Sequence, residues 1–164
     1  MEITDLIQKF SVSRTTQQKA IFSSIFIIGN RLQTLFDNHI PLISLKQFML
    51  LSLVHQSKEQ LTFTQLGKLL GCSRQNITKL ASILEKKGFI SIQKSPNDMR
   101  ALCICPTPQM NVFFSEDFTK YQKELDYLFD IYSDEELEVL FNLLMKWYSG
   151  ISDFEKLIDE QESK

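Results

Sequence analysis

The stretch GCSRQNITKLASILEKKGFISIQKSPNDMRALCICPT, from Gly71 to Thr107, decides the fold of this chain. Its first part predicts a helix, because Ser73 is a good N-cap and apolar residues follow at helical spacing. The predicted buried face of that helix consists of Ile77, Leu80, Ile83 and Leu84. Gly88 ends the helix, since glycine takes a positive φ without steric cost. Apolar residues then alternate within FISIQ and within ALCIC, and the turn sequence SPND lies between these two segments. This pattern predicts a β-hairpin with a basic tip.

The exposed face of the predicted helix carries side chains of the kind that contact DNA bases. They are Arg74, Gln75, Asn76, Thr78 and Lys79. Arginine pairs bidentately with guanine, and asparagine or glutamine pairs with adenine. A shorter helix precedes this one: Thr62 and Gln65 form its capping box and Gly71 closes it. Its predicted buried side chains are Leu66, Leu69 and Leu70. Two helices joined by a short turn, followed by a hairpin, predict a winged helix-turn-helix. The alternative interpretation is an ordinary solvated helix face.

Long helices are expected on both sides of this element. Residues 14–38 carry an apolar stripe, and the helix from the capping box of Ser44 and Gln47 to about His55 is nearly all apolar. After Thr107 a helix stripe continues to Tyr132, and the last helix, opened by Ser133, alternates apolar residues at spacings of 3 and 4. Residues 1–13 are compatible with a helix or a loose arm. Three helices carry more apolar surface than a small winged domain can cover, which favours a two-fold dimer over packing within one chain.

The predicted fold class is therefore mainly α with a small β-hairpin wing: a winged helix-turn-helix with long N- and C-terminal dimerisation helices. We divide the chain into an N-terminal dimerisation region (1–40), a DNA-binding domain (41–107) and C-terminal dimerisation helices (108–164). The net charge of −2 conceals a strong asymmetry. Residues 64–106 hold seven bases and two acids, whereas residues 111–164 hold fourteen acids and five bases. A polyanion would be attracted to the middle of the chain and repelled by its C-terminal part.

The sequence resembles the MarR family of bacterial transcriptional regulators from about Arg14 to Leu157. The most specific matches are the helix end Leu84-Glu85-Lys86-Lys87-Gly88, the wing motif Asp98-Met99-Arg100 and the capping Thr107. The chain departs from the family at two places. Met99 stands where a second wing arginine is common. In the first wing strand, Ile92 and Gln93 stand where the family often has basic residues. The resemblance implies a homodimer on a pseudo-palindromic site, with recognition helices one DNA turn, roughly 34 Å, apart.

DNA contacts are expected from both parts of the motif. Ser73 and Thr64 would hold phosphates through hydroxyls and helix N-terminal amides. Lys94 and Arg100 would approach the minor groove, where a narrow A·T tract favours arginine. Asp98 would pair with Arg100 or stabilise the hairpin turn.

The resemblance also implies a small-molecule effector pocket between the dimer helices and the winged domain. The phenylalanines that could line it are Phe22, Phe26, Phe36, Phe48 and Phe113. They favour an apolar or aromatic effector. The alternative is that these rings belong to the protein core.

Other classes of function find less support. Cys103 and Cys105 share one face of a strand and are expected to be buried, while Cys72 beside a helix N-terminus is a candidate redox sensor. His39 and His55 are isolated, so no metal site and no cofactor is expected. No P-loop, nucleophile elbow or dinucleotide fingerprint is present, which argues against an enzyme. No signal peptide or membrane span is evident, so a cytoplasmic location is expected.

We therefore predict a homodimeric, MarR-like transcriptional regulator of double-stranded DNA, with repression as the expected mode. Two alternatives stay open: a winged-helix protein-interaction module without specific DNA binding, and a thiol-based redox-responsive regulator. The operator sequence, the regulated genes and the identity of any effector do not follow from the sequence.

Overall fold

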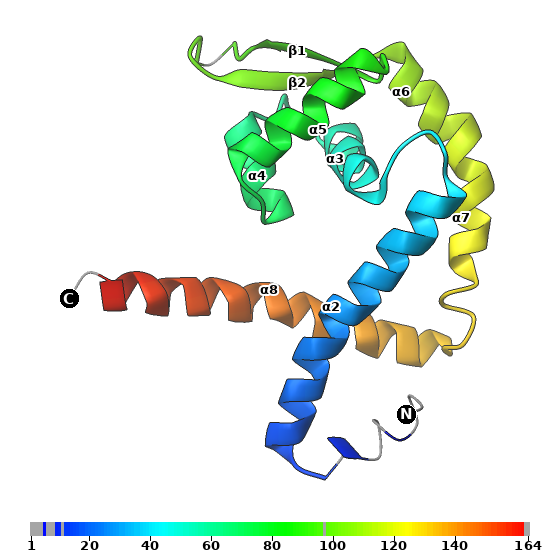
Figure 1. Cartoon of the computed structure of the whole chain (residues 1–164), viewed down its shortest axis with the longest axis vertical. Helices are drawn as coiled ribbons and strands as arrows, with labels where there is room; N and C mark the ends of the chain where they lie inside the picture. Colours follow the sequence, from blue (N-terminus) through cyan, green and yellow to red (C-terminus); the bar gives the residue numbers. More distant parts are fainter. Residues whose placement is uncertain (1–4, 6–8, 11, 97, 163–164) are drawn as a thin grey trace. The chain divides into compact units, whose positions relative to one another are not determined.

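The computed structural model describes residues 5, 9–10, 12–96 and 98–162, and Figure 1 shows their arrangement along the chain. The chain forms two compact units, Met1–Asn111 and Val112–Lys164. The first unit contains α2 (Arg14–His39), α3 (Leu45–Gln56), α4 (Phe63–Leu70), α5 (Arg74–Lys86), β1 (Ile90–Lys94) and β2 (Leu102–Pro106). α6 (Pro108–Val112) spans the boundary, and the second unit contains η1 (Phe113–Asp117), α7 (Phe118–Asp126) and α8 (Asp134–Glu162). The alternatives for residues 1–13 fall mostly outside the described residues, as does Asn97 of the predicted turn.

Capping boxes start α3 and α4 as predicted, and the same arrangement starts α8. The Ser44 hydroxyl accepts from the Gln47 amide at the start of α3, and the Gln47 side chain accepts from Ser44 N–H. The equivalent exchange between Thr62 and Gln65 begins α4. At the start of α8, Ser133 and Glu136 make the same pair of bonds. Each box satisfies two backbone donors that a helix start would leave unpaired.

The core of the winged domain lies where α3, α4 and α5 meet the hairpin. Leu50, Leu51, Leu66, Ile77, Ala81, Leu84 and Ile104 are at most 1% exposed. The prediction of burial is wrong for two residues: the side chain of Leu69 is 58% exposed and that of Ile83 is 42% exposed. Small residues hold buried positions in the two helices instead. Gly67 of α4 approaches the Cys72 carbonyl so closely that a Cβ built there would lie 2.7 Å from that oxygen, and Ala81 is buried in α5. The helices therefore pack along a face shifted from the one that the leucine and isoleucine spacing predicts.

The hairpin forms as predicted, with β1 and β2 antiparallel and Ile92 opposite Ile104. In Figure 1 the two strands lie above α4 and α5, which are neighbouring helices. The outer edge of β2 pairs briefly with the chain before α4, through the bridge between Thr62 and Cys103. This extra pairing is a single bridge, too short to leave a strand pattern in the sequence. Gly88 has φ 82°, as its place after the helix predicts.

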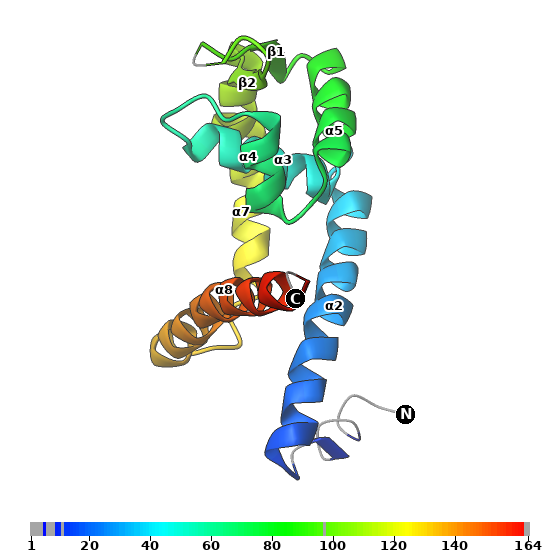
Figure 2. The same ribbon diagram turned by 90° about the vertical axis from the view of Figure 1, so that its left-hand side faces the viewer.

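The helix α2 is one unbroken helix of 26 residues, as Figure 2 shows. Only its last turns pack in the first unit: Phe36 is buried and its ring lies 5.2 Å from that of Phe48 in α3. The rest of its apolar stripe is exposed in this chain, including Ile21, Phe22, Ile25, Phe26 and Ile28. Within the described part of the first unit, nothing covers this face of α2.

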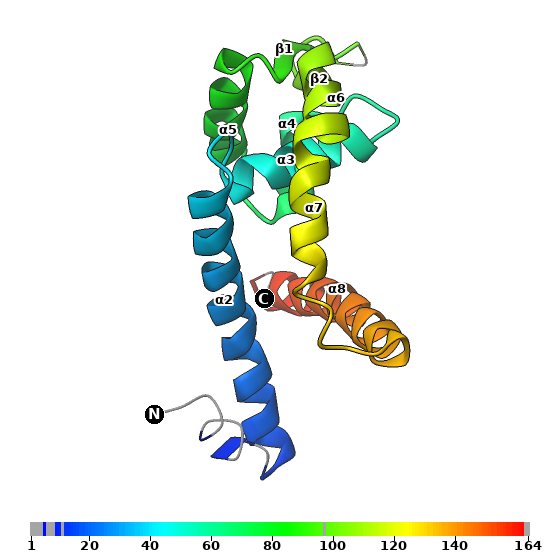
Figure 3. The same cartoon turned by 90° about the vertical axis from the view of Figure 1, so that its right-hand side faces the viewer.

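The helix predicted after Thr107 differs in the structure from the prediction. We expected one helical stripe from Thr107 to Tyr132, but the helix passes through the π-helical segment η1 and ends at Asp126 (Figure 3). A π-turn takes more residues per turn than an α-helix, which rotates the stripe beyond it. Bonds from Tyr127 N–H to Glu124 and from Leu128 N–H to Leu125 tighten the last turn and close the helix.

The helix α8 carries the predicted heptad seam on an exposed face. Its seam residues are Leu137, Leu140, Leu144, Trp147, Ile151, Phe154 and Ile158. Their side chains are 37–61% exposed. Among the described residues, no helix has the length and hydropathy needed to cross a bilayer.

Candidate nucleic-acid interface

The helix α5 presents the predicted polar face to solvent. Ser73 caps it by accepting a hydrogen bond from the Asn76 amide at 3.3 Å, while Ile77, Ala81 and Leu84 hold the opposite face in the core. This anchoring fixes the rotation of the helix about its axis. As a result, all five predicted base-contacting side chains are exposed: Arg74, Gln75, Asn76, Thr78 and Lys79.

Local bonds limit what two hydroxyls on this helix can do. The Ser73 oxygen is used as an acceptor by the cap, so towards a phosphate it would act as a donor. The Thr78 hydroxyl donates to the Arg74 carbonyl at 2.9 Å, which leaves its acceptor lone pairs and its methyl group for a partner. Thr64 is exposed in the first turn of α4 and can offer both its hydroxyl and its place near the helix N-terminus.

The wing tip is organised by Asp98. Its carboxylate accepts from the Arg100 backbone N–H at 2.9 Å, and its carbonyl accepts from Ala101 N–H at 2.9 Å. Of the two roles predicted for Asp98, the structure shows the turn-stabilising one. Ser95 N–H then bonds to the Ala101 carbonyl and closes the loop. The side chains of Lys94 and Arg100 are exposed.

Two charged residues link α5 to its surroundings, and the sequence did not indicate either role. Glu85, near the end of α5, accepts the backbone N–H of Ile92 in β1 at 2.7 Å. Lys87 donates to the Leu42 carbonyl at 2.7 Å and to the Gln47 side chain at 3.3 Å. Lys87 is therefore a structural cation that ties the end of α5 to the start of α3. The Leu-Glu-x-x-Gly pattern locates Glu85 but not its partner.

The five phenylalanines predicted to line an effector pocket are not gathered in one place within the first unit. Phe22 and Phe26 contact one another edge to face, with ring centroids 5.1 Å apart, and both rings are exposed. Phe36 and Phe48 form a separate pair. Phe113 belongs to the second unit, where its ring meets Phe114 edge to face and lies near Phe118 at a tilt. Their assignment to a pocket stays a prediction.

The cysteines are all free thiols. Cys103 and Cys105 are buried, as predicted. Burial raises the pKa of the Cys105 thiol, and the neighbouring Cys103 raises it further. Cys72 is partly exposed in the turn between α4 and α5. Among the described residues, no three histidine, cysteine or acidic side chains are grouped as a metal site would require.

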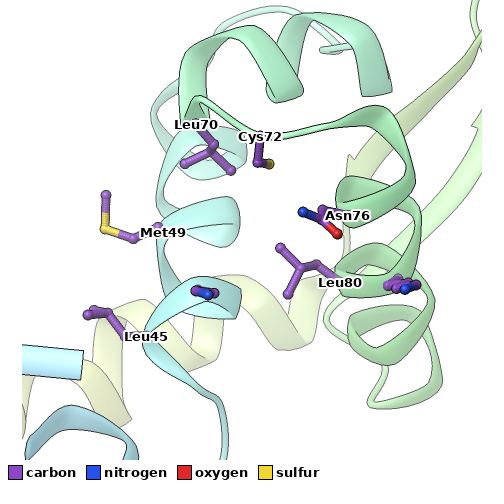
Figure 4. A pocket seen from close by; sticks show the side chains of 8 residues that line it. Leu45, Met49, Leu70, Cys72, Asn76 and Leu80 are labelled. Carbon is purple, nitrogen blue, oxygen red and sulfur yellow. The ribbon is translucent and has the colours of Figure 1, made fainter. Parts of the chain in front are cut away.

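A cavity of about 470 Å³ lies beside the helix-turn-helix (Figure 4). It is bounded by α3, the end of α4, the turn at Cys72 and the inner side of α5. Asn76 and Leu80 project from α5 towards α3 in Figure 4. Its lining combines residues that the sequence placed in the core with Asn76 and Lys79 of the predicted DNA face. No sequence motif marks this cavity, because its walls come from three separate elements.

The winged helix-turn-helix matches a known family. The family model described as MarR family covers residues 43–102, which include α3, α4, α5 and β1 and reach the start of β2. Over residues 43–102 the chain is similar to the MarR family. The helix α5 and the wing motif Asp98-Met99-Arg100 fall inside the matched segment.

Two curated relatives match the chain over part of its length. One is an uncharacterized HTH-type transcriptional regulator, YcgE, of Bacillus subtilis, 33% identical over 86 residues, which are 52% of this chain and 56% of the relative. The other is the transcriptional repressor MprA of Escherichia coli, 30% identical over 107 residues, which are 65% of this chain and 61% of the relative. The match therefore spans about three fifths of each relative's length.

Solved structures confirm the fold. The regulator BldR from Sulfolobus solfataricus superposes with a TM-score of 0.69 at 19% identity, covering 82% of this chain and 99% of BldR. MepR of S. aureus, solved in complex with DNA, superposes with a TM-score of 0.68 at 22% identity, covering 79% of this chain and 97% of MepR. The predicted winged-helix architecture is thus confirmed.

Proposed function

We propose that this chain is a DNA-binding transcriptional regulator that acts as a homodimer. The observation that carries the proposal is the face of α5: five exposed polar side chains held in a fixed rotation by a buried opposite face. Such a helix can enter the major groove and pair with base edges. In this proposal, residues 41–107 bind DNA, and residues 1–40 and 108–164 form the interface between the two copies of the chain.

The charge distribution supports DNA as the partner. Residues 64–106 carry a net charge of +5 in a protein whose total is −2. Two of these bases, Lys94 and Arg100, are exposed at the wing, and Arg74 and Lys79 are exposed on α5. Each phosphate that such a group neutralises releases counterions, so the affinity should fall steeply with salt.

The exposed helix faces support the homodimer. The seam of α8 and the stripe of α2 leave many large apolar side chains in water. Faces of this size mark an interaction surface, and a two-fold pairing of identical copies covers both at once. A dimer would present two recognition helices to the two halves of a pseudo-palindrome.

Repression and release by an effector complete the proposal. The curated relative MprA is a transcriptional repressor, which supports the same direction of control here. An apolar or aromatic effector would act by binding more tightly to a dimer whose recognition helices are wrongly spaced for DNA.

The proposal is tested by titrating fluorescent DNA from upstream of the chain's own gene and measuring anisotropy at several salt concentrations. We expect specific DNA to compete far better than random DNA, and log affinity to fall linearly with log salt. Arg74→Ala and Asn76→Ala should each weaken specific binding by about 1–3 kcal/mol. Lys120→Ala, an exposed lysine of α7, is the matched control and should bind like wild type.

Equal affinity of wild type for specific and random DNA, with no salt dependence, would contradict the proposal. That outcome favours the other candidate, a winged-helix module that binds protein. The support for this candidate is the low positive charge of the wing, where Gln93 and Met99 take places that are often basic in the family.

A further inference from the structure

The end of α2, the loop after it and the first turn of α3 form a closely bonded corner of the first unit. In the last turn of α2, the Asp37 carboxylate accepts a hydrogen bond from the Leu45 backbone N–H at 2.6 Å. Ile40 and Ile43 of the loop are buried, and so is Phe36 of α2. These contacts hold α3 in a defined direction with respect to the last turns of α2.

Lys87 joins the end of α5 to this corner. It is the C-cap residue of α5, and its ammonium group donates to the Leu42 carbonyl at 2.7 Å and to the Gln47 side-chain oxygen at 3.3 Å. The same Gln47 oxygen accepts from the Ser44 N–H at 3.2 Å, and the Gln47 side chain is buried. One ammonium group therefore binds both the loop after α2 and the capping box of α3. Hydrogen bonds from a cation are stronger than those between neutral groups.

Lys87 lies at the opposite end of α5 from the side chains proposed to contact DNA. Gln75 precedes it by about 12 residues, which is about 18 Å along an α-helix at about 1.5 Å per residue. A tilt of α5 by about 10° around its C-terminal end would therefore move Gln75 by about 3 Å. Since one base-pair step of DNA is about 3.4 Å, that tilt would displace the polar face of α5 by nearly one step.

Apolar packing between α3 and α5 does not fix this tilt by itself. Packed helices of the same class differ in their crossing angle by about 15–20°. The buried side chains Ile77, Ala81 and Leu84 fix the rotation of α5 about its own axis. Directional bonds at the end of the helix are then needed to select one tilt.

We propose that Lys87 is a positioning residue, whose bonds to Leu42 and Gln47 set the tilt of α5 relative to α2 and thereby the distance between the two copies of α5 in the homodimer. The second part of this inference rests on the proposed function. It requires that α2 belongs to the interface between the copies and that α5 binds DNA. The first part concerns one chain and is measured without DNA.

The tilt is measured with two spin labels in one chain. Arg31→Cys in α2 and Gln75→Cys in α5 are both at exposed positions, and pulsed electron paramagnetic resonance gives the distance between the labels. The background is Cys72→Ser, because the other two native thiols are buried. Labelled chain is diluted into an excess of unlabelled chain, so that only distances within one chain contribute, whether or not the chain dimerises.

Three substitutions isolate the ammonium group. Lys87→Met keeps the aliphatic stem and removes the charge, and it should shift or widen the distance distribution by about 3 Å, as a tilt of about 10° requires. Lys87→Arg keeps a cation with several donors and should restore most of the wild-type distribution. Lys86→Met removes the neighbouring exposed lysine of α5 and, as the matched control, should leave the distribution unchanged.

A second pair of variants tests the connection from the side of α2. Asp37→Ala removes the acceptor of the Leu45 N–H and should also shift or widen the distribution, whereas Asp37→Asn keeps an oxygen acceptor and should not. Circular dichroism establishes that each variant is folded, and Asp37→Ala decides the test if Lys87→Met does not fold. A wild-type distribution in folded Lys87→Met overturns the proposal, and so does an equal change in Lys86→Met.

The DNA arm tests the distance between the two copies of α5. It uses duplexes that wild type binds, with the centres of the half-sites at the native separation or one base pair closer or further apart. Wild type should prefer one separation by about tenfold, and Lys87→Met should reduce that preference to about threefold or move it to another separation. An equal loss of affinity at all separations overturns the role of Lys87 in spacing. A wild-type chain that never binds DNA disproves the proposed function, while the spin-label distances still test the positioning of α5.

Discussion

At the scale of single residues, Asp98 determines how the wing presents Arg100. Its carboxylate accepts a hydrogen bond from the Arg100 backbone N–H, and the side chain of Arg100 is exposed beside the closed turn. The two residues therefore have different roles: one stabilises the turn, and the other is available to DNA. Their substitutions should differ accordingly.

Arg100→Ala should weaken binding to specific and random DNA by a similar factor and reduce the slope of log affinity against log salt by about 1. The reason is that an arginine in the minor groove responds to groove width and phosphate charge rather than to base identity. Anisotropy titrations at four salt concentrations measure both quantities. Wild-type affinity of the variant at low salt would show that the wing does not contact DNA.

Asp98 offers a conservative comparison. Asp98→Asn keeps an oxygen that can accept from Arg100 N–H, so it should retain most of the affinity of wild type for DNA. Asp98→Ala loses that bond and should lower the affinity in the direction of Arg100→Ala. Equal loss in both variants would mean that the charge of Asp98, and not its turn, matters.

The three thiols should react with iodoacetamide in an order set by burial. The raised pKa of Cys105 keeps that thiol protonated at a pH where an exposed cysteine is partly ionised, and the thiolate is the reactive form. We expect Cys72 to be alkylated at least about tenfold faster than Cys103 or Cys105 at pH 8 in the folded chain. Peptide mass spectrometry measures the three rates, and their convergence in urea is the control for accessibility.

At the scale of elements, close packing in the helix-turn-helix depends on Gly67. A Cβ at this position would meet the Cys72 carbonyl at 2.7 Å, and a backbone atom cannot move aside cheaply. Gly67→Ala should therefore destabilise the fold by about 1–3 kcal/mol, as overpacking does. Gly29 in α2 is the matched control, because a Cβ there meets nothing within 4 Å.

Gly29→Ala should stabilise the chain by up to about 1 kcal/mol, through helix propensity. Thermal or urea unfolding of the two variants measures the contrast. A Gly67→Ala variant as stable as wild type would show that α4 and the turn at Cys72 can separate without cost.

The sequence predicted those elements whose signals are local. Capping pairs such as Ser44 and Gln47, the positive φ of Gly88 and the alternation of the two wing strands are properties of short segments, and all are found in the structure. The sequence-based prediction was wrong where the burial of a residue depends on which other element packs against it. Ile83 has the right spacing for the core but is exposed, and the π-turn after Val112 has no residue pattern of its own.

The candidate site divides in the same way. The exposed face of α5 follows from periodicity alone. The cavity beside it, and the bonds of Glu85 and Lys87 to distant backbone groups, join residues 7 to 45 positions apart in the chain. No single segment contains that information.

At the scale of the whole molecule, the exposed seam of α8 makes the assembly testable. Leu144 lies within that seam and is 48% exposed in the single chain. If two copies pair through it, Leu144→Glu buries a charge in an apolar interface and should raise the dimer Kd by at least about a hundredfold. Sedimentation velocity over a range of concentrations measures the change.

Glu155→Gln, an exposed polar residue of the same helix, is the control and should remain dimeric. A wild-type chain that sediments as a monomer at all concentrations would contradict the pairing. A Leu144→Glu variant that stays dimeric would assign the interface to other residues.

The bond between Glu85 and Ile92 has a consequence for the DNA sequence itself. The Glu85 carboxylate accepts the Ile92 backbone N–H, and this hydrogen bond links the end of α5 to the first wing strand. In the proposed complex with DNA, the protein would then set the distance between the bases that α5 contacts and the minor-groove step that the wing contacts. Inserting one base pair between these two positions, about 3.4 Å along the axis, should cost as much affinity as losing one of the two contacts. If the proposed complex forms, the length of each half-site is fixed, and target promoters should differ from one another there by base substitutions and not by insertions.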